Sequence, residues 1–199
     1  PGAKIRLRRC GNGPVMLEVG ANFTVATDAC VGDVNRCSTT YAGMAQDVRP
    51  EDLLLVDDGK ILLRVDHVDG NDIVTEVLEG GIVSDNKGIN MPGVGVSVPA
   101  LAEKDIDDLR WALRTGTDLV ALSFVRSAAD IADVHAVMDE VGIRVPVLAK
   151  IEKPQAVDNL ADIIAAFDGV MVARGDLGVE LPIEQVPLVQ KQAISMCRN

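Results

Sequence analysis

The second half of the sequence repeats one pattern three times, and this repeat limits the folds open to the chain. Apolar, β-branched runs at 118–125, 145–152 and 169–174 lie about 25 residues apart. A segment with helical spacing of apolar residues follows each run, and another, 101–116, precedes the first. Strands that alternate with helices predict parallel βα units, whose apolar strands form a sheet that helices cover.

The first half, from about residue 5 to 97, follows a different pattern. Short β-branched runs are broken by Asp-Gly and Gly-Asn pairs, and helical periodicity is almost absent. We expect a small all-β barrel or sandwich here. Asp58 and Gly59 are predicted to form a hairpin turn, because such a pair adopts the positive φ that tight turns require.

Charge and composition exclude several kinds of partner. The 199 residues are 48% hydrophobic and carry a net charge of −11, so we expect neither nucleic acid nor an anionic membrane surface as a partner. No apolar run reaches the roughly 18–20 residues of a membrane span, and no signal-peptide pattern opens the sequence. The four cysteines show no CxxC spacing, which indicates reduced thiols and a cytoplasmic location.

Both a doubly wound sheet and an eightfold barrel have this βα pattern. No GxGxxG motif follows a strand, which disfavours dinucleotide binding. Chemistry in a barrel is located where the strands end. The residues at the predicted strand ends include charged and polar side chains, which favours the barrel: Ser123, Phe124, Lys150, Glu152, Arg174, Gly175 and Asp176.

These strand ends predict a metal site. Glu152 and Asp176 follow neighbouring strands, and two such carboxylates can share a hard cation such as Mg²⁺ or Mn²⁺. No His or Cys accompanies them to favour zinc. Lys150 is two residues from Glu152, so both side chains face the same way, and its ammonium can stabilise negative charge on a substrate. Gly175 and Gly178 expose backbone amides that can bind an anion.

Each residue also has a purely structural interpretation. Glu152 precedes Pro154 and can interact with a helix N-terminus, while Asp176 can be a turn residue with Lys150 as its surface partner. Their joint occurrence at successive strand ends favours a functional site. Two further functions are compatible with these residues: a metal-dependent aldolase or lyase on a similar barrel, or a noncatalytic binding fragment.

Seven stretches of the sequence resemble pyruvate kinases, the bacterial and actinobacterial members most closely: KIR, LLVDDGKI, NKGINMPG, PALAEKDIDDL, LSFVRSAADI, AKIEKPQAVDNL and DGVMVARGDLGVELP. The resemblance implies transfer of the phosphoryl group of phosphoenolpyruvate to ADP, giving pyruvate and ATP, the last step of glycolysis. It also implies an α/β fold, a partial TIM (β/α)8 barrel with an inserted small all-β barrel as a lid. Residues 1–4 would end a barrel strand and form a hinge, 5–97 the lid, and 98–199 part of the barrel.

The same resemblance assigns roles to individual residues. Glu152 and Asp176 would hold Mg²⁺ or Mn²⁺, and Lys150 would stabilise the transferring phosphoryl group and the enolate oxygen. Lys4 would occupy the charge position of K⁺, so that K⁺ is not required. The substrate pocket would comprise Ser123, Phe124, Lys150, Ala173, Arg174, Gly175 and Asp176, and the nucleotide would lie near Arg6, Asp58 and Lys87.

The resemblance further implies a homotetrameric full-length protein. A closed barrel takes about 200–250 residues, more than remain outside the all-β region, so we expect the chain on its own to be inactive. The inserted β region, together with KIEKP and ARGDLG, argues against the aldolase or lyase alternative.

Overall fold

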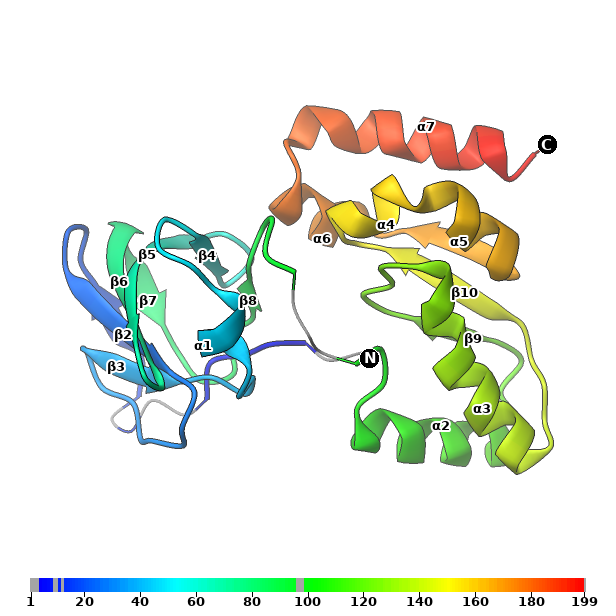
Figure 1. The fold of residues 1–199 in the computed structure, drawn as a ribbon, viewed down its shortest axis with the longest axis horizontal. Helices are drawn as coiled ribbons and strands as arrows, with labels where there is room; N and C mark the ends of the chain where they lie inside the picture. The colour runs from blue at the N-terminus through cyan, green and yellow to red at the C-terminus, as the bar shows by residue number, and fades with distance from the viewer. Residues whose placement is uncertain (1–3, 9–10, 12, 96–98, 199) are drawn as a thin grey trace. The chain divides into compact units, whose positions relative to one another are not determined.

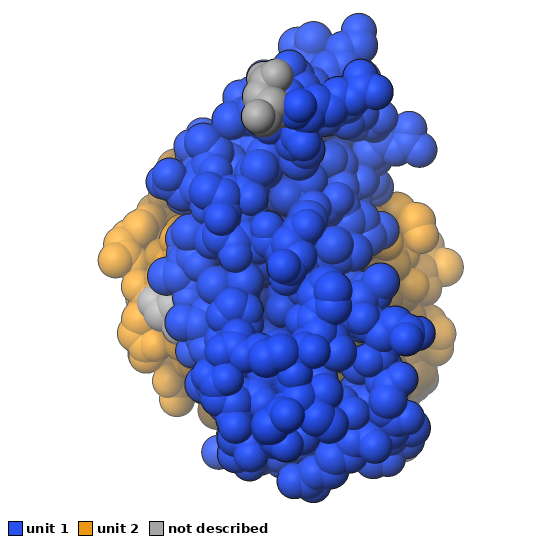
Figure 2. Space-filling view, turned by 90° about the vertical axis from the view of Figure 1, so that its right-hand side faces the viewer, with its two compact units in different colours: residues 1–3, 99–199 blue, residues 4–98 orange. Residues whose placement is uncertain are grey.

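The computed structural model describes residues 4–8, 11, 13–95 and 99–198. The chain divides into two compact units, 4–98 and 1–3 with 99–199, which Figure 2 shows in different colours. The joins predicted at residues 1–4 and 98 fall largely on 1–3 and 96–98, which lie outside the described residues.

The unit of residues 4–98 is built from β-strands. Its elements are β1 (Val15–Leu17), β2 (Asn22–Ala26), β3 (Arg36–Ser38), α1 (Met44–Asp47), β4 (Leu53–Val56), β5 (Ile61–Asp69), β6 (Asp72–Glu79), β7 (Gly81–Val83) and β8 (Ile89–Asn90). Six strands form a sheet in the order β3-β2-β6-β5-β4-β8, in which only β2 and β3 pair in parallel. β1 and β7 form a separate antiparallel pair.

The segment 5–8 connects the two edges of this six-stranded sheet. The Leu7 amide donates to the Lys87 carbonyl at 2.8 Å beside β8, and the Arg8 amide donates to the Ser38 carbonyl at 2.7 Å in β3. Inward-facing apolar side chains from β2, β4, β5 and β6 fill the interior, Phe23, Val25, Leu54, Leu63 and Ile73 among them. Alternation of buried and exposed residues along β6 is typical of a strand with one face on a core.

The turn between β4 and β5 has an uncommon backbone. Asp58 and Gly59 have φ values of 57° and 85°, which confirms the positive φ predicted for them. Asp57, which the sequence pattern did not single out, is also left-handed at φ 54°. Aspartate tolerates this region better than most residues. The loop has four residues, 57–60, because Val56 pairs with Ile61.

The unit of residues 99–199 alternates strands and helices. Its elements are α2 (Glu103–Thr115), β9 (Val120–Leu122), η1 (Ala128–Asp130), α3 (Ile131–Val141), β10 (Val147–Ile151), α4 (Pro154–Asp158), α5 (Leu160–Ala166), β11 (Gly169–Val172), α6 (Arg174–Glu180), η2 (Ile183–Gln185) and α7 (Val186–Met196). The strands form a parallel sheet in the order β11-β10-β9, as predicted for βα units. Figure 1 shows α2 beside α3 and α5 beside α7, pairs that are in contact.

Three elements differ from the sequence prediction. The strand predicted at 118–125 ends at Leu122, because the chain turns at Phe124, whose φ is 57°. The strand predicted at 169–174 ends at Val172, and Arg174, which was expected to end that strand, begins a helix instead. The single helix predicted after β10 is divided into α4 and α5 at Asn159, whose side chain donates to the Arg126 carbonyl at 2.9 Å.

A buried cluster holds this unit together. It contains side chains from the sheet and from the covering helices, including Leu113, Val134, Ile151, Ile163 and Leu177. No helix within the described ranges is long and apolar enough to cross a bilayer.

Candidate active site

Glu152 is a buried carboxylate directly after the last residue of β10. It is 1% exposed. Its Oε2 accepts a hydrogen bond from the Phe124 amide at 2.9 Å. Its Oε1 forms an ion pair with Lys150 Nζ but accepts no hydrogen bond from the described residues. A carboxylate oxygen can accept from two partners, so Oε1, with only the Lys150 ammonium beside it, has coordination capacity left.

Lys150 connects the ends of β9 and β10. Its ammonium pairs with Glu152 and also donates to Ser123 Oγ at 3.0 Å. The prediction that Lys150 and Glu152 face the same way is therefore confirmed by their contact. The Lys150 side chain is 22% exposed, so its charge is reachable from solvent while it lies beside a buried carboxylate.

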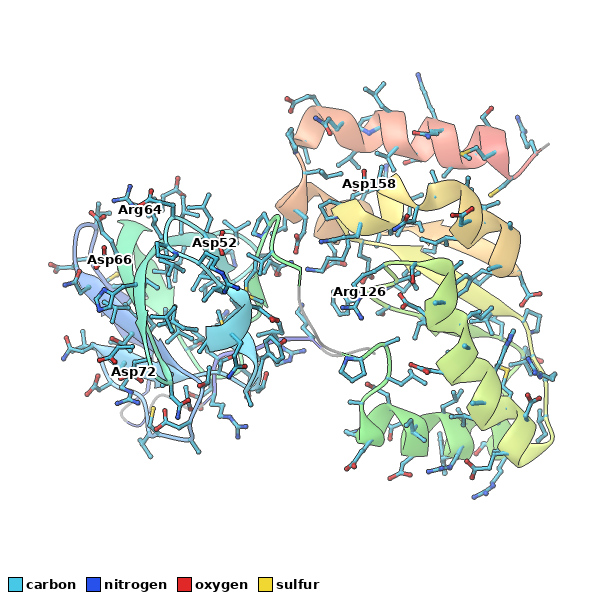
Figure 3. All side chains as sticks on the ribbon, in the orientation of Figure 1. Asp52, Arg64, Asp66, Asp72, Arg126 and Asp158 are labelled. Atoms are coloured by element: carbon cyan, nitrogen blue, oxygen red, sulfur yellow. The ribbon has the colours of Figure 1, made fainter. Side chains whose placement is uncertain are left out.

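Phe124 orients the loop after β9. A bulky residue at φ 57° is uncommon, and such conformations persist where surrounding contacts hold them. Here the amide points at Glu152, and the ring lies 5.8 Å from Lys153 Nζ, within cation–π range. The same loop continues to Arg126, whose side chain Figure 3 labels.

The residues Ala173 to Asp176 lie at the start of α6, beside the end of β10. β10 and β11 are parallel neighbours with Ile151 opposite Val172, and the Ala173 amide donates to the Ile151 carbonyl at 3.2 Å. Arg174 and Gly175 are exposed, and Asp176 is half-buried. The structure shows no hydrogen bond or ion pair of the Asp176 carboxylate within its described part.

This site has two acidic side chains that can hold a metal ion, Glu152 and Asp176. Across the described ranges, no group of three or more His, Cys, Asp or Glu side chains is placed to hold a metal ion. A hard cation that is bound through Glu152 and Asp176 would therefore need further oxygen ligands from water or from a substrate. This ligand set suits Mg²⁺, which commonly binds through one or two carboxylates and keeps several waters.

The residues expected near a nucleotide lie in the other unit, and two of them, Arg6 and Lys87, are on neighbouring segments. Arg6 forms an antiparallel bridge with Gly88, the residue after Lys87, and its guanidinium donates to the Asn86 carbonyl at 2.9 Å. The side chain of Lys4 lies over Gly88, since a Cβ added there would be 2.9 Å from Lys4 Cε. Arg6, Lys87 and Lys4 thus gather around one short segment.

Asp57 fixes the position of Lys87. Its Oδ1 accepts from Lys87 Nζ at 2.9 Å and its Oδ2 from Lys60 Nζ at 3.0 Å. The hydrogen bond from Lys87, followed by that from Lys60, holds the pKa of Asp57 below its usual value. Asp58 lies next in this turn. The sequence pattern indicated Asp58 and Lys87 but not Asp57. The left-handed turn brings the Asp57 carboxylate to Lys87, and the sequence gives no sign of this contact.

Sequence reasoning also missed Lys153 and Glu180. They form an ion pair in which the Lys153 side chain is 18% exposed and the Glu180 side chain 2%. They lie 27 residues apart, on segments that only the folded chain brings together. The only sequence feature that could have indicated this pair is the position of the charged residue Lys153 directly after Glu152.

Comparisons with known proteins identify the family of the chain. The family model described as "Pyruvate kinase, barrel domain" matches residues 1–199. The chain is 59% identical over its whole length to a pyruvate kinase of Mycobacterium tuberculosis, 57% to one of Corynebacterium glutamicum and 43% to one of Clostridium perfringens. It covers 42% of each of these relatives. The chain belongs to the pyruvate kinase family.

Proposed function

We propose that the protein transfers the phosphoryl group of phosphoenolpyruvate to ADP and that the strand ends around Glu152 form its catalytic site. Membership of a family of phosphotransferases supports the reaction. The observation that supports the site most directly is the cluster of Ser123, Lys150 and Glu152. In it, the buried Glu152 carboxylate lies beside the Lys150 ammonium, and its Oε1 accepts no hydrogen bond from the described residues.

Glu152 and Asp176 would hold a divalent cation, Mg²⁺ or Mn²⁺. Both are oxygen donors, and each has a carboxylate oxygen that no described residue hydrogen-bonds. A bound ion of this kind supplies Lewis-acid stabilisation of negative charge on oxygen. The amides of Gly175 and Asp176, in the first turn of α6, have no acceptor within the helix and suit a substrate carboxylate. Ala173, Arg174, Ser123 and Phe124 would line the pocket.

Lys150 would act on the charge that the reaction creates. The bond between phosphorus and the enol oxygen of phosphoenolpyruvate breaks, and its electron pair stays on that oxygen. A terminal oxygen of ADP forms the new bond to phosphorus, and protonation of the enolate carbon gives pyruvate. An ammonium that Glu152 and Ser123 hold in place stabilises both the phosphoryl oxygens and the enolate without reorganising.

The proposal extends to the fold of the whole protein. Residues 98–199 would form part of a (β/α)8 barrel, and 5–97 a lid carrying Arg6, Asp58 and Lys87 to the nucleotide. Lys4 would take the charge position of K⁺, so that turnover needs Mg²⁺ but not K⁺. The family resemblance alone supports a cytoplasmic homotetramer.

The test replaces the matching segment of the Mycobacterium tuberculosis relative with this chain and measures pyruvate formation from phosphoenolpyruvate and ADP, with Mg²⁺ and without K⁺. We expect turnover, and a loss of at least about 10²-fold in Lys150→Met, the scale for removing a group that stabilises developing charge. Lys191→Met, which changes an exposed lysine of α7, is the matched control. A folded Lys150→Met protein that retains full turnover would refute the site.

A further inference from the structure

We propose that the ion pair of Lys153 and Glu180 sets the geometry of the two metal-binding carboxylates, as a pair of positioning residues. This inference rests on the proposed function, because it concerns the site of Glu152 and Asp176. The proposed function gives neither Lys153 nor Glu180 a role in binding the metal or the substrate.

The first observation is the position of Lys153. It directly follows Glu152 and precedes Pro154, the first residue of α4, in an extended conformation of φ −120° and ψ 147°. Successive residues of an extended chain point to opposite sides, so its side chain leaves Glu152 and reaches α6. There its ammonium pairs with Glu180 Oε1, while 5.8 Å separate it from the ring of Phe124.

The second observation is the place of Glu180 on α6. Glu180 is the last residue of this helix, and Asp176 lies four residues earlier. Residues four apart lie on the same face of a helix, one turn from each other. A contact that fixes Glu180 therefore also fixes the rotation of α6 about its axis and with it the direction of Asp176.

The third observation is that Lys153 contacts both sides of the site. Phe124, under its ammonium, donates its amide to Glu152 Oε2. Glu180, at its other side, belongs to the helix that carries Asp176. The half-buried ammonium of Lys153 thus joins the segment that orients Glu152 to the element that orients Asp176.

Energetics support a role beyond stability. A buried ion pair has a desolvation cost that often equals its attraction, so apolar residues of similar volume frequently replace it without loss of stability. Groups that orient metal ligands are different, because changing them typically weakens metal binding by about 10–100-fold. The double substitution Lys153→Met/Glu180→Leu removes both charges of the pair together, so it separates these two roles.

The test titrates Mn²⁺ into the 199-residue chain and follows free Mn²⁺ by electron paramagnetic resonance. We expect the double variant to bind Mn²⁺ at least about tenfold more weakly while its circular dichroism and urea midpoint stay unchanged. Lys153→Arg keeps the charge and should restore binding to within about threefold of the parent chain, since the guanidinium can pair with Glu180.

The matched control removes an ion pair of the same unit on the outer helices. Arg110 of α2 pairs with Glu140 of α3 at 2.8 Å, and Arg110→Met/Glu140→Leu should leave Mn²⁺ affinity unchanged. Should Lys153→Met/Glu180→Leu unfold, Glu180→Ala removes the contact on one side only; weaker Mn²⁺ binding in this folded variant supports the inference, and unchanged binding overturns it.

The outcomes separate the inference from the proposed function. A parent chain that binds no Mn²⁺ would overturn the metal site and the inference together. A parent that binds Mn²⁺, with the double variant binding equally well, would leave the site in place and overturn only the positioning role of Lys153 and Glu180.

Discussion

Leu177 is the residue through which we expect α6 to be most easily loosened. A helix of seven residues is not stable by itself, so α6 depends on its packing. Leu177 and Glu180 are its buried residues, and Leu177 is 0% exposed. Leu177→Ala removes three carbons at about 0.8 kcal/mol each, and with the cavity that remains the expected loss of unfolding free energy is about 2–5 kcal/mol.

Urea unfolding followed by circular dichroism at 222 nm measures this loss. The signal reports mainly on the unit of residues 99–199, because α2 to α7 lie there and α1 spans only Met44–Asp47. With a slope of about 1.5 kcal/mol per molar urea, a loss of 3 kcal/mol lowers the midpoint by about 2 M. Mn²⁺ binding should weaken as well, because Asp176 precedes Leu177.

The control is Leu188→Ala in α7, where the same atoms are removed from a side chain that is 65% exposed. We expect a change within about 0.5 kcal/mol. If Leu177→Ala costs less than about 1 kcal/mol, α6 is not held through the packing of Leu177, and this prediction is refuted.

Three further predictions concern the unit of residues 4–98. Lys87 and Lys60 lower the pKa of Asp57, so its carboxylate stabilises the fold above the ordinary pKa of about 3.9 and loses this contribution as the pH falls through the lowered value. The difference in unfolding free energy between the parent chain and Asp57→Asn should thus be constant above about pH 5 and shrink below about pH 4; a difference that ignores pH contradicts the pairing. The Thr75 hydroxyl, fully buried, donates to the Phe23 carbonyl at 2.6 Å, so Thr75→Val should cost about 1 kcal/mol in thermal unfolding, and no loss would show that this bond contributes nothing. Lys4→Glu, made in the Mycobacterium tuberculosis relative that carries this chain in place of its own segment, should make pyruvate formation depend on K⁺. A variant whose pyruvate formation does not change with K⁺ refutes that role of Lys4.

Local rules explain what the sequence predicted well. Side-chain alternation along an extended chain depends only on neighbouring residues, and it correctly placed Lys150 with Glu152. The spacing of the apolar runs likewise predicted three parallel strands, and the strands expected at 145–152 and 169–174 are neighbours, with Ile151 opposite Val172. The positive φ of Gly59 follows from the preference of that residue type alone.

Long-range contacts explain what it missed. The strand before Phe124 looks continuous in the sequence, and it ends early because the amide of Phe124 turns to a carboxylate 28 residues later. The break at Asn159 depends on the Arg126 carbonyl, 33 residues away. No pattern within a short window of sequence contains such partners, so these features require the folded chain.

The segment 5–8 has a consequence for the order in which the chain folds. It completes the six-stranded sheet by bonding to Ser38 on one edge and to Lys87 on the other, so the first residues of the unit need partners about 80 residues later. On a ribosome, this sheet cannot close until nearly all of its unit has emerged. The βα units after residue 99 instead pair β9 with β10 and β10 with β11, each within about 30 residues. Because pairing between distant residues slows folding, the unit synthesised second should reach its native contacts faster once complete.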